Sequence, residues 1–323
     1  MSTISSSNND TTSHPTSHLP LVPKKIYMYW HTLPAPPFIT LCLQTFRHHN
    51  PSHTVTLLSL TSFPPSTLPP NFDQLSLPHQ SDYLRLTWML EHGGTYIDAS
   101  CVCLKPLDDL IDYNEERVQG YKSPFARKDP NMEIWSFTCP PSSPLISLWR
   151  SELVTAISVG FETYCETSTA EEIGNELKGR LPYLTTNLCW RKANIMRPGE
   201  CVFRESNFSD GPLSILERYG WDGRRCVRDL MREDVDVGGA RFLKFRGKER
   251  SYIVEMIEEG DYGERGVLTR ALGLEGKEGK KGKEKKRGRV QEMRDFEGLM
   301  KSMEGGEVKP MKKKKKKKEK EGR

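Results

Sequence analysis

The N-terminal third of the chain alternates between short apolar segments and amphipathic ones. Residues 25–30 (KIYMYW) and 54–58 (TVTLL) are rich in β-branched and aromatic side chains, which predicts strands. Between them, apolar residues at helical spacing predict a helix that ends at Asn50-Pro51. This order of elements is typical of βαβ units around a mostly parallel sheet. We therefore expect an α/β fold.

The alternation continues along the next forty residues. Ser81 is a candidate N-cap for a helix over residues 81–91, and Gly93-Gly94 is its expected end. Residues 95–97 predict a third strand, which ends near Asp98. Ligands of such sheets bind beyond the carboxyl ends of the strands, so this is where a site is expected.

The second half of the folded region is less regular in its pattern. Residues 133–137 predict a strand and residues 144–159 predict a helix, whereas residues 160–260 mix short helices and loops in no clear order. Three regions follow from composition. Residues 1–21 are polar and predicted to be disordered, residues 22–270 form one domain, and residues 271–323 are a Gly/Lys/Glu-rich, disordered tail.

Charge is divided unevenly between the domain and the tail. The chain carries 48 basic and 43 acidic residues, a net charge of +5. Residues 271–323 hold 20 basic and 10 acidic residues, so residues 1–270 carry 28 basic and 33 acidic ones. A mildly acidic domain argues against nucleic-acid binding by the folded part, and any such binding is expected only through the tail.

The eight cysteines show no metal-binding or redox pattern. No pair has C-x-x-C spacing, which disfavours a structural zinc site. Cys101 and Cys103 lie two residues apart and are expected to be ordinary core residues with free thiols. No run of residues is apolar and long enough to cross a membrane. G-x-S-x-G and P-loop motifs are also missing, so hydrolase and NTPase activities lack support.

The residues with the chemistry of a binding site are concentrated in one segment, SDYLRLTWMLEHGGTYIDAS, residues 81–100. Asp82 and Arg85 are three residues apart and share a helix face, expected in its first turn. Gly93 and Gly94 allow a sharp turn and a close approach to a ligand. Asp98 follows at a strand end. One arginine and two carboxylates suit a sugar diphosphate, although a plain ion pair and a surface Asp explain the same spacing.

This segment resembles glycosyltransferases with a DXD-containing sugar-binding region, which include α-mannosyltransferases, and most closely the capsular polysaccharide synthesis protein family. The family pattern is SDxxRxxxLxxxGGxYxD, and residues 81–98 match it with Met89 at the position of the Leu. Residues 22–32 (VPKKIYMYWHT) are similar to the opening strand of the family, residues 46–58 to its next helix and strand, and residues 103–111 continue it. The resemblance implies a GT-A-like, nucleotide-sugar-binding domain.

The resemblance also implies roles for particular residues. Asp82 and Arg85 would orient the donor sugar and its phosphates, with Gly93 and Gly94 beside them. Asp98 would hold Mn²⁺ or Mg²⁺ on the diphosphate. No catalytic base is implied for any residue.

The metal-binding pattern departs from the family in its second position. It reads Asp98-Ala99-Ser100 where the family usually has Asp-x-Asp. Because a neutral hydroxyl is a poorer ligand for a hard cation than a carboxylate is, Ser100 is expected to be a weak ligand. Metal dependence is therefore less secure here than in the family.

Three further residues are weaker candidates. Tyr29 and Trp30 lie at the end of the first strand and can stack on a nucleotide base, although core packing explains them equally well. Asp210, in the turn Asp210-Gly211-Pro212, is a weak candidate for the metal or the acceptor, and a plain turn is the alternative.

The sequence thus predicts a glycosyltransferase that moves a hexosyl group from a nucleoside diphosphate sugar to a glycan or other hydroxyl acceptor, metal-assisted and with retention. Two alternatives stay open. One is a relative that binds a sugar or nucleotide without catalysis, and the other acts through its basic tail on RNA or an acidic membrane. The residues do not identify the donor sugar, the base of the nucleotide or the acceptor. Since no signal or anchor is visible, a cytoplasmic location is expected, with the Golgi lumen as the alternative if the N-terminus is incomplete.

Overall fold

A computed structural model describes residues 21–124 and 131–274 of the chain. The predicted disorder of residues 1–21 and 271–323 therefore falls almost wholly outside the described residues. The exceptions are Leu21 and the last four described residues, 271–274, which continue the fold. Leu272 is buried, so the domain extends beyond the predicted boundary at residue 270.

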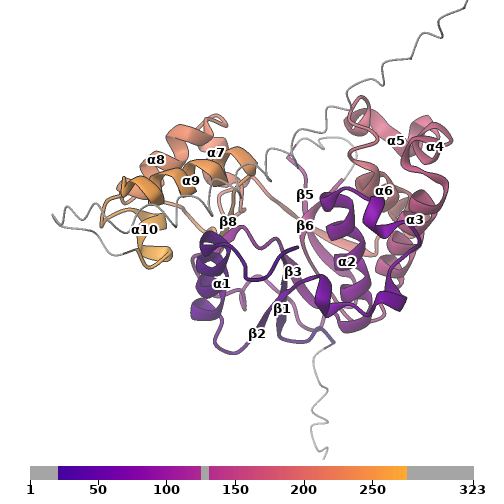
Figure 1. Ribbon diagram of the computed structural model, residues 1–323, viewed down its shortest axis with the longest axis horizontal. Helices are drawn as coiled ribbons and strands as arrows, with labels where there is room; N and C mark the ends of the chain where they lie inside the picture. Colours follow the sequence, from indigo (N-terminus) through magenta and orange to yellow (C-terminus); the bar gives the residue numbers. More distant parts are fainter. Residues whose placement is uncertain (1–20, 125–130, 275–323) are drawn as a thin grey trace, which may run out of the picture.

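A six-stranded sheet forms the centre of the molecule (Figure 1). Its strands, in spatial order, are β2 (Thr54–Leu58), β1 (Lys25–Tyr29), β3 (Gly94–Ile97), β6 (Met132–Cys139), β5 (Val118–Lys122) and β7 (Cys201–Glu205). The pairings β1–β2, β1–β3 and β5–β7 are parallel, and β3–β6 and β5–β6 are antiparallel. The prediction of an α/β fold with a mostly parallel sheet is confirmed.

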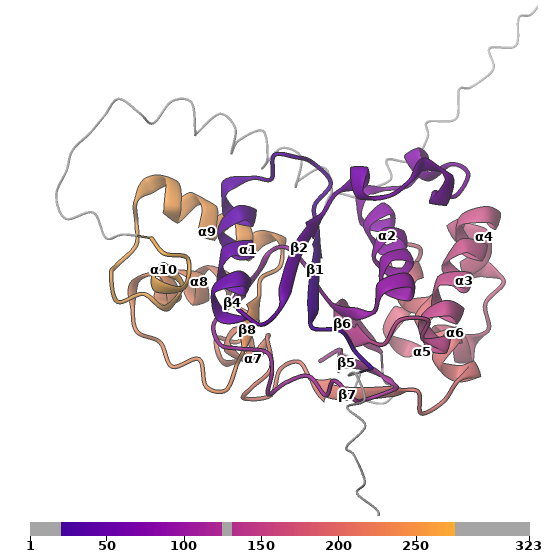
Figure 2. The same cartoon turned by 90° about the horizontal axis from the view of Figure 1, so that it is seen from below.

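Helices cover both faces of this sheet, as Figures 1 and 2 show. One face packs on α2 (Leu77–His92), α3 (Pro144–Val159) and α6 (Thr185–Met196), with the short helices α4 (Phe161–Glu166) and α5 (Ala170–Leu177) beyond them. The other face packs on α1 (Pro37–His49), and α8 (Gly223–Arg232), α9 (Gly247–Glu259) and α10 (Val267–Ala271) lie beyond it, near α7 (Ser214–Arg218), in the same apolar cluster (Figure 2). Each face has its own apolar core.

A second, two-stranded sheet joins residues 101–103 to residues 242–244. Strand β4 (Cys101–Cys103) follows β3 after a short turn and pairs antiparallel with β8 (Phe242–Lys244). In this pairing Cys101 lies opposite Lys244. A residue from the C-terminal part of the chain is thereby fixed next to the turn that follows β3.

The predicted elements are recovered with one shift that affects the site. The strand at 54–58 and the helix at 144–159 have the predicted bounds. Helix α2, however, begins at Leu77 with Ser76 as its N-cap residue, and not at Ser81. Pro78 lies in its first turn, where a proline costs no helical hydrogen bond, so the helix can start before the predicted cap. The Pro-rich segment before it contains three short 3₁₀ turns, Leu60–Ser62, Pro65–Thr67 and Phe72–Gln74.

The cysteines agree with the expectation of free thiols in the core. All eight lie in the described residues, none forms a disulfide, and seven of them are buried. Within residues 21–124 and 131–274, no helix combines the length and the apolar character needed to cross a membrane.

Candidate functional site

A cavity of about 480 Å³ opens at the carboxyl ends of β1 and β3. This volume lies within the roughly 300–1,000 Å³ typical of small-molecule sites. Its walls come from α2, from β6, from the start of α6 and from residues 244–250, which run from the end of β8 into the first turn of α9. The cavity is therefore where the sheet topology predicts a ligand.

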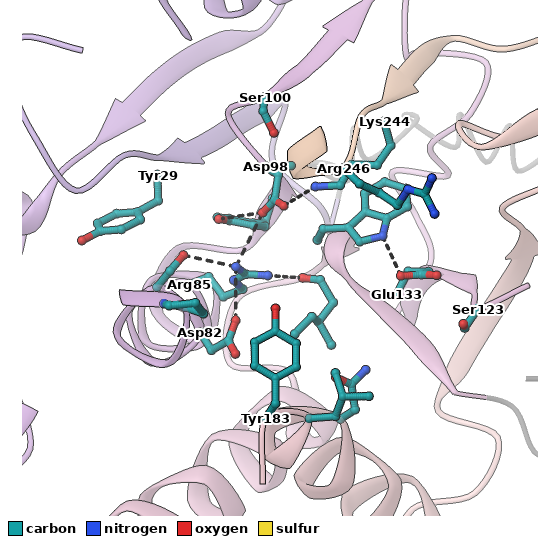
Figure 3. Close-up of a pocket in the computed structure, with 18 of the residues that line it drawn as sticks. Tyr29, Asp82, Arg85, Asp98, Ser100, Ser123, Glu133, Tyr183, Lys244 and Arg246 are labelled. Atoms are coloured by element: carbon teal, nitrogen blue, oxygen red, sulfur yellow. Dashed lines mark hydrogen bonds and ion pairs between the residues drawn. The ribbon is translucent and has the colours of Figure 1, made fainter. Parts of the chain in front are cut away.

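Asp98 is fixed at this position by the backbone on both sides of it. It follows Ile97, the last residue of β3, and its N–H donates to the carbonyl of Trp135 on β6 at 2.9 Å. Its own carbonyl accepts from the N–H of Cys101 at 3.0 Å, which closes the turn into β4. The Asp98 side chain is 24% exposed and faces the cavity (Figure 3).

The carboxylate of Asp98 contacts two cationic side chains. Its Oδ2 lies 2.5 Å from the ammonium group of Lys244, and its Oδ1 lies 3.5 Å from Nη2 of Arg85. The Tyr96 hydroxyl donates to Oδ1 at 3.4 Å. Burial alone would raise the pKa of Asp98, but the charges of Lys244 and Arg85 outweigh it and hold that pKa below its ordinary value. Asp98 is thus an ion-paired carboxylate.

Arg85 lies beneath the cavity, between Asp82 and Asp98 (Figure 3). Its side chain is 7% exposed. Nη1 donates to the carbonyl of Ile134 at 2.6 Å, and Nη2 donates to Ser81 Oγ at 3.1 Å. The guanidinium also lies 4.7 Å from the centre of the Tyr96 ring. These contacts join α2 to β6 and hold the guanidinium against Asp98.

Asp82 connects Arg85 to the opposite wall. Its Oδ1 lies 3.2 Å from Nη2 of Arg85, and its Oδ2 accepts from the Thr186 hydroxyl on α6 at 2.7 Å. The predicted i,i+3 pair is present. Its predicted place in the first turn of the helix is wrong, because α2 begins five residues before Asp82. The contribution of the helix N-terminus to this pair is correspondingly absent.

Tyr29 is the last residue of β1 and Trp30 follows it; both line the cavity, as the sequence predicts for residues at that strand end. Both are largely buried, with 7% and 8% of their surface exposed. Burial raises the pKa of Tyr29 to about 12, so its hydroxyl stays protonated at neutral pH. Their position is consistent with both core packing and contact with a bound base.

Gly93 and Gly94 are not brought to the cavity, which corrects the prediction that they approach a donor. Gly93 precedes β3 and Gly94 is its first residue, whereas Asp98 follows its last, so the length of the strand separates both glycines from the site. A Cβ on Gly93 would lie 2.5 Å from the backbone N of Pro141, and one on Gly94 would lie 2.8 Å from the carbonyl O of Lys25. Positive φ angles and close backbone packing explain both glycines.

Ser100 lies in the turn after β3 and lines the cavity, but Asp210 does not. The Ser100 hydroxyl is buried and accepts from Nη1 of Arg250 at 3.2 Å. Asp210 is exposed, in the loop before α7, where its Cβ packs near Gly239. The structure therefore does not place Asp210 beside Asp98 and Ser100. Asp98 and Ser100 both lie in the segment between β3 and β4 and not in a strand.

A divalent cation does not fit the arrangement of the described residues around Asp98. Mg²⁺ is usually held by one or two carboxylates together with substrate phosphates. In the part of the chain that the structure describes, no group of three or more His, Cys, Asp or Glu side chains is placed to hold a metal ion by protein ligands alone. The only carboxylate of the motif is paired with Lys244 and Arg85, and Ser100 accepts from Arg250. Metal binding itself stays a prediction.

Several residues that line the cavity were missed from the sequence. They come from β6 and from the segment around β8: Glu133, Trp135, Lys244, Arg246 and Arg250. One signal was available. Lys244 is the only charged residue in the apolar run Phe242-Leu243-Lys244-Phe245, and a lone charge in a buried strand points to a specific partner.

The pKa of Glu133 is shifted in the opposite direction from that of Asp98. It lines the cavity from β6, and its Oε2 accepts from the indole N–H of Trp135 at 2.6 Å. Burial raises the pKa of Glu133, although the Trp135 hydrogen bond and the charge of Lys244 oppose the rise. Perturbed carboxylates in a cavity are candidates for catalytic roles.

The chain is similar to one protein family and, more distantly, to several solved glycosyltransferase structures. The model of the capsular polysaccharide synthesis protein family matches residues 2–158. No curated protein sequence matches the chain. Among solved structures, the PaToxG glycosyltransferase is 15% identical, with 56% of this chain and 81% of that chain covered and a TM-score of 0.35. GlyE of Streptococcus pneumoniae TIGR4 is 13% identical, with 79% and 61% covered and a TM-score of 0.41.

A galactosyltransferase, LgtC, in complex with donor and acceptor sugar analogues is 12% identical, with 57% and 74% covered and a TM-score of 0.34. The overall likeness to these structures is low, and the family match is the stronger finding. It covers the segment from β1 through α3, which contains the Asp82, Arg85 and Asp98 motif. The match confirms the resemblance that the motifs indicated: residues 2–158 carry the pattern of the capsular polysaccharide synthesis family.

Proposed function

We propose that this protein is a glycosyltransferase, which moves a hexosyl group from a nucleoside diphosphate sugar to a hydroxyl group of a glycan or another acceptor. One observation supports this most strongly. The motif residues Asp82, Arg85 and Asp98 form a connected chain of ion pairs along one cavity, at the strand ends where an α/β sheet binds its ligand.

The cavity offers different chemistry to the different parts of such a donor. Tyr29 and Trp30 provide aromatic surface at the end of β1 for the base. Asp98, next to two cations, provides an acceptor for sugar hydroxyls, and Lys244 provides a positive charge for the phosphates. Asp82 and Arg85 hold this arrangement in place from below, through Thr186 and Ile134.

In the proposed reaction the bond between the anomeric carbon and the diphosphate oxygen breaks, and a bond to the acceptor oxygen forms. On the retaining course that the family resemblance implies, the leaving diphosphate takes the proton of the acceptor hydroxyl. Positive charge develops on the sugar ring in the transition state, and a nearby carboxylate stabilises it. We assign this role to Glu133, because Asp82 and Asp98 are both paired with Arg85.

The acceptor is expected at the open side of the cavity. Tyr183 lies there, before α6, and is 63% exposed (Figure 3). An exposed aromatic ring at the rim of a cavity suits stacking against a sugar ring. The Mn²⁺ or Mg²⁺ expected from the resemblance would have to compete with Lys244 and Arg85 for the Asp98 carboxylate, and no step described here depends on it.

Turnover of a donor panel tests this function. Uridine and guanosine diphosphate sugars are incubated with the protein, with and without simple glycan acceptors, and released nucleoside diphosphate is measured. We expect release from at least one donor and much less from Glu133→Gln. The anomer of the first-formed product, read by NMR, tests retention. Release equal to the protein-free blank for every donor, with no donor bound, would contradict the proposal.

A donor-binding protein without catalysis is the second candidate, and Ser100 favours it because it replaces a carboxylate of the family motif. The same panel separates the two, since this candidate binds a donor without releasing nucleoside diphosphate. Action through the basic tail concerns residues outside the described ranges. Its test is binding to RNA or acidic vesicles that falls steeply with salt and is lost when the tail is removed.

A further inference from the structure

Both polar positions of the Asp98-Ala99-Ser100 motif are contacted by basic residues from one distant segment. Lys244 lies 2.5 Å from Asp98 Oδ2, and Arg250 donates to Ser100 Oγ at 3.2 Å. These two cations come from β8 and from the first turns of α9, almost 150 residues later in the chain. Where the family pattern implies a divalent cation, this chain places two cationic side chains of its own.

The fold holds these cations in fixed positions. The β4–β8 pairing sets Lys244 opposite Cys101, three residues after Asp98. The Lys244 side chain is 9% exposed and lies 5.4 Å from the centre of the Trp135 ring. Buried between a carboxylate and an indole, it loses little conformational freedom when a ligand binds. An ammonium group has three donors, so its pairing with Asp98 leaves capacity for a phosphate oxygen.

The other residues around Lys244 extend the positive region. Arg246 and Gly247, at the start of α9, line the cavity together with Arg250. Arg246 pairs with Glu249, whose carboxylate also accepts from the backbone N–H of Arg246 at the start of the helix. Five cationic and four carboxylate side chains line the cavity, and burial raises the pKa of one of those carboxylates, Glu133. The cavity is therefore suited to an anion.

We propose that Lys244 and Arg250 neutralise the diphosphate of the donor in this site, in place of a divalent cation, so that donor binding needs no metal. The proposal rests on the proposed function, because it concerns the same cavity and the same donor. A donor diphosphate carries one negative charge on each phosphate, and the leaving diphosphate gains another. An arginine fork and a lysine point charge are both suited to phosphate oxygens.

Titration calorimetry of the full chain with UDP and with GDP tests this, first in EDTA and then with MnCl₂. We expect one nucleoside diphosphate to bind in EDTA, with an affinity within about threefold of that in MnCl₂. Lys244→Met and Arg250→Gln should each weaken binding about tenfold or more, since each removes a charge-assisted hydrogen bond to phosphate. Lys24→Met is the matched control, because Lys24 is an ion-paired lysine outside the cavity.

The outcomes distinguish this proposal from the proposed function. Binding that occurs only with MnCl₂ would overturn the fixed-cation proposal and leave the donor site standing. Binding in EDTA that neither Lys244→Met nor Arg250→Gln weakens would also overturn it. If neither nucleotide nor any donor of the panel binds under either condition, the proposed function fails and this proposal fails with it. Comparison of EDTA with MnCl₂ uses the unaltered protein, so the test does not depend on the folding of a variant.

Discussion

The ammonium group of Lys244 lies 2.5 Å from Oδ2 of Asp98, although 146 residues separate the two in the sequence. Asp98 belongs to the part that the family model matches, and Lys244 lies outside it. The β4–β8 pairing brings them together. The candidate site is therefore completed by a segment that the family motif does not contain.

Asp98→Asn should destabilise the fold as well as impair donor binding. The change leaves the ammonium group of Lys244, which is 9% exposed, without its carboxylate. A buried donor that loses its partner costs about 1–3 kcal/mol, so we expect a loss in that range in urea denaturation at pH 7. Because the folded-state pKa of Asp98 is lowered, its contribution is complete above its ordinary pKa and is lost as pH falls. The difference between the two proteins should shrink toward acid pH.

Asp108→Asn is the matched control for that experiment. Asp108 pairs with Lys24 at 2.7 Å, but their side chains are 41% and 42% exposed. Exposed ion pairs contribute at most about 1 kcal/mol, so this change should cost less than Asp98→Asn. Equal losses for the two variants would contradict the account of a buried Asp98–Lys244 pair.

Glu133→Gln should separate stability from activity. The folded state raises the pKa of Glu133, so ionising it costs folding free energy as pH rises through that value. The amide keeps an acceptor for the Trp135 N–H but has no charge. We expect a higher melting temperature at pH 7, unchanged donor binding, and transfer about 100-fold slower, the scale typical for a lost electrostatic group.

The pH profile of the unaltered protein gives the same test without a variant. Transfer needs ionised Glu133, so kcat should rise with pH through a value above the ordinary pKa of a glutamate. If Glu133→Gln transferred the sugar at the rate of the unaltered protein, Glu133 would have no role in the reaction.

Gly94→Ala should lower stability without changing donor affinity. The glycine has φ of +95°, and an added Cβ would lie 2.8 Å from the carbonyl O of Lys25. Gly160→Ala is the control, because Gly160 has φ of +89° with open space around it. Both substitutions strain the backbone, but only the first adds a clash, so Gly94→Ala should have the lower melting temperature. If Gly94→Ala, and not Gly160→Ala, reduced the affinity for UDP or GDP, Gly94 would be part of the donor site after all.

Arg85→Lys should weaken both folding and nucleotide binding. A single ammonium group cannot reach the Ile134 carbonyl, Asp82 and Asp98 together. Arg150→Lys is the matched control. Arg150 also makes two side-chain hydrogen bonds and lies against a tyrosine ring, but it does not line the cavity. It should lose stability and keep nucleotide affinity, and the same pattern in Arg85→Lys would make Arg85 merely structural.

Local pattern was sufficient to predict the elements that carry the motif. The strand at 54–58, the helix at 144–159 and the place of Asp98 at a strand end all follow from periodicity and turn residues. The start of α2 did not, because Ser76 and Ser81 are both plausible caps and Pro78 favours the earlier one.

The partners of Asp98 could not be predicted from spacing. Arg85 lies in the same motif, but Lys244 reaches Asp98 only through the pairing of two three-residue strands far apart in the chain. The prediction that two glycines approach the donor was wrong for a related reason. Gly93 and Gly94 are close to Asp98 in sequence, yet they lie at the start of β3, whereas Asp98 follows the end of that strand.

A crystal structure with the nucleoside diphosphate that binds best in calorimetry tests the central claim most directly. The account predicts the diphosphate in the cavity beside Asp98, within hydrogen-bond distance of Lys244 and Arg250, and the base next to Tyr29 and Trp30. A nucleotide bound on another surface, with the cavity empty and Lys244 still paired only with Asp98, would contradict it.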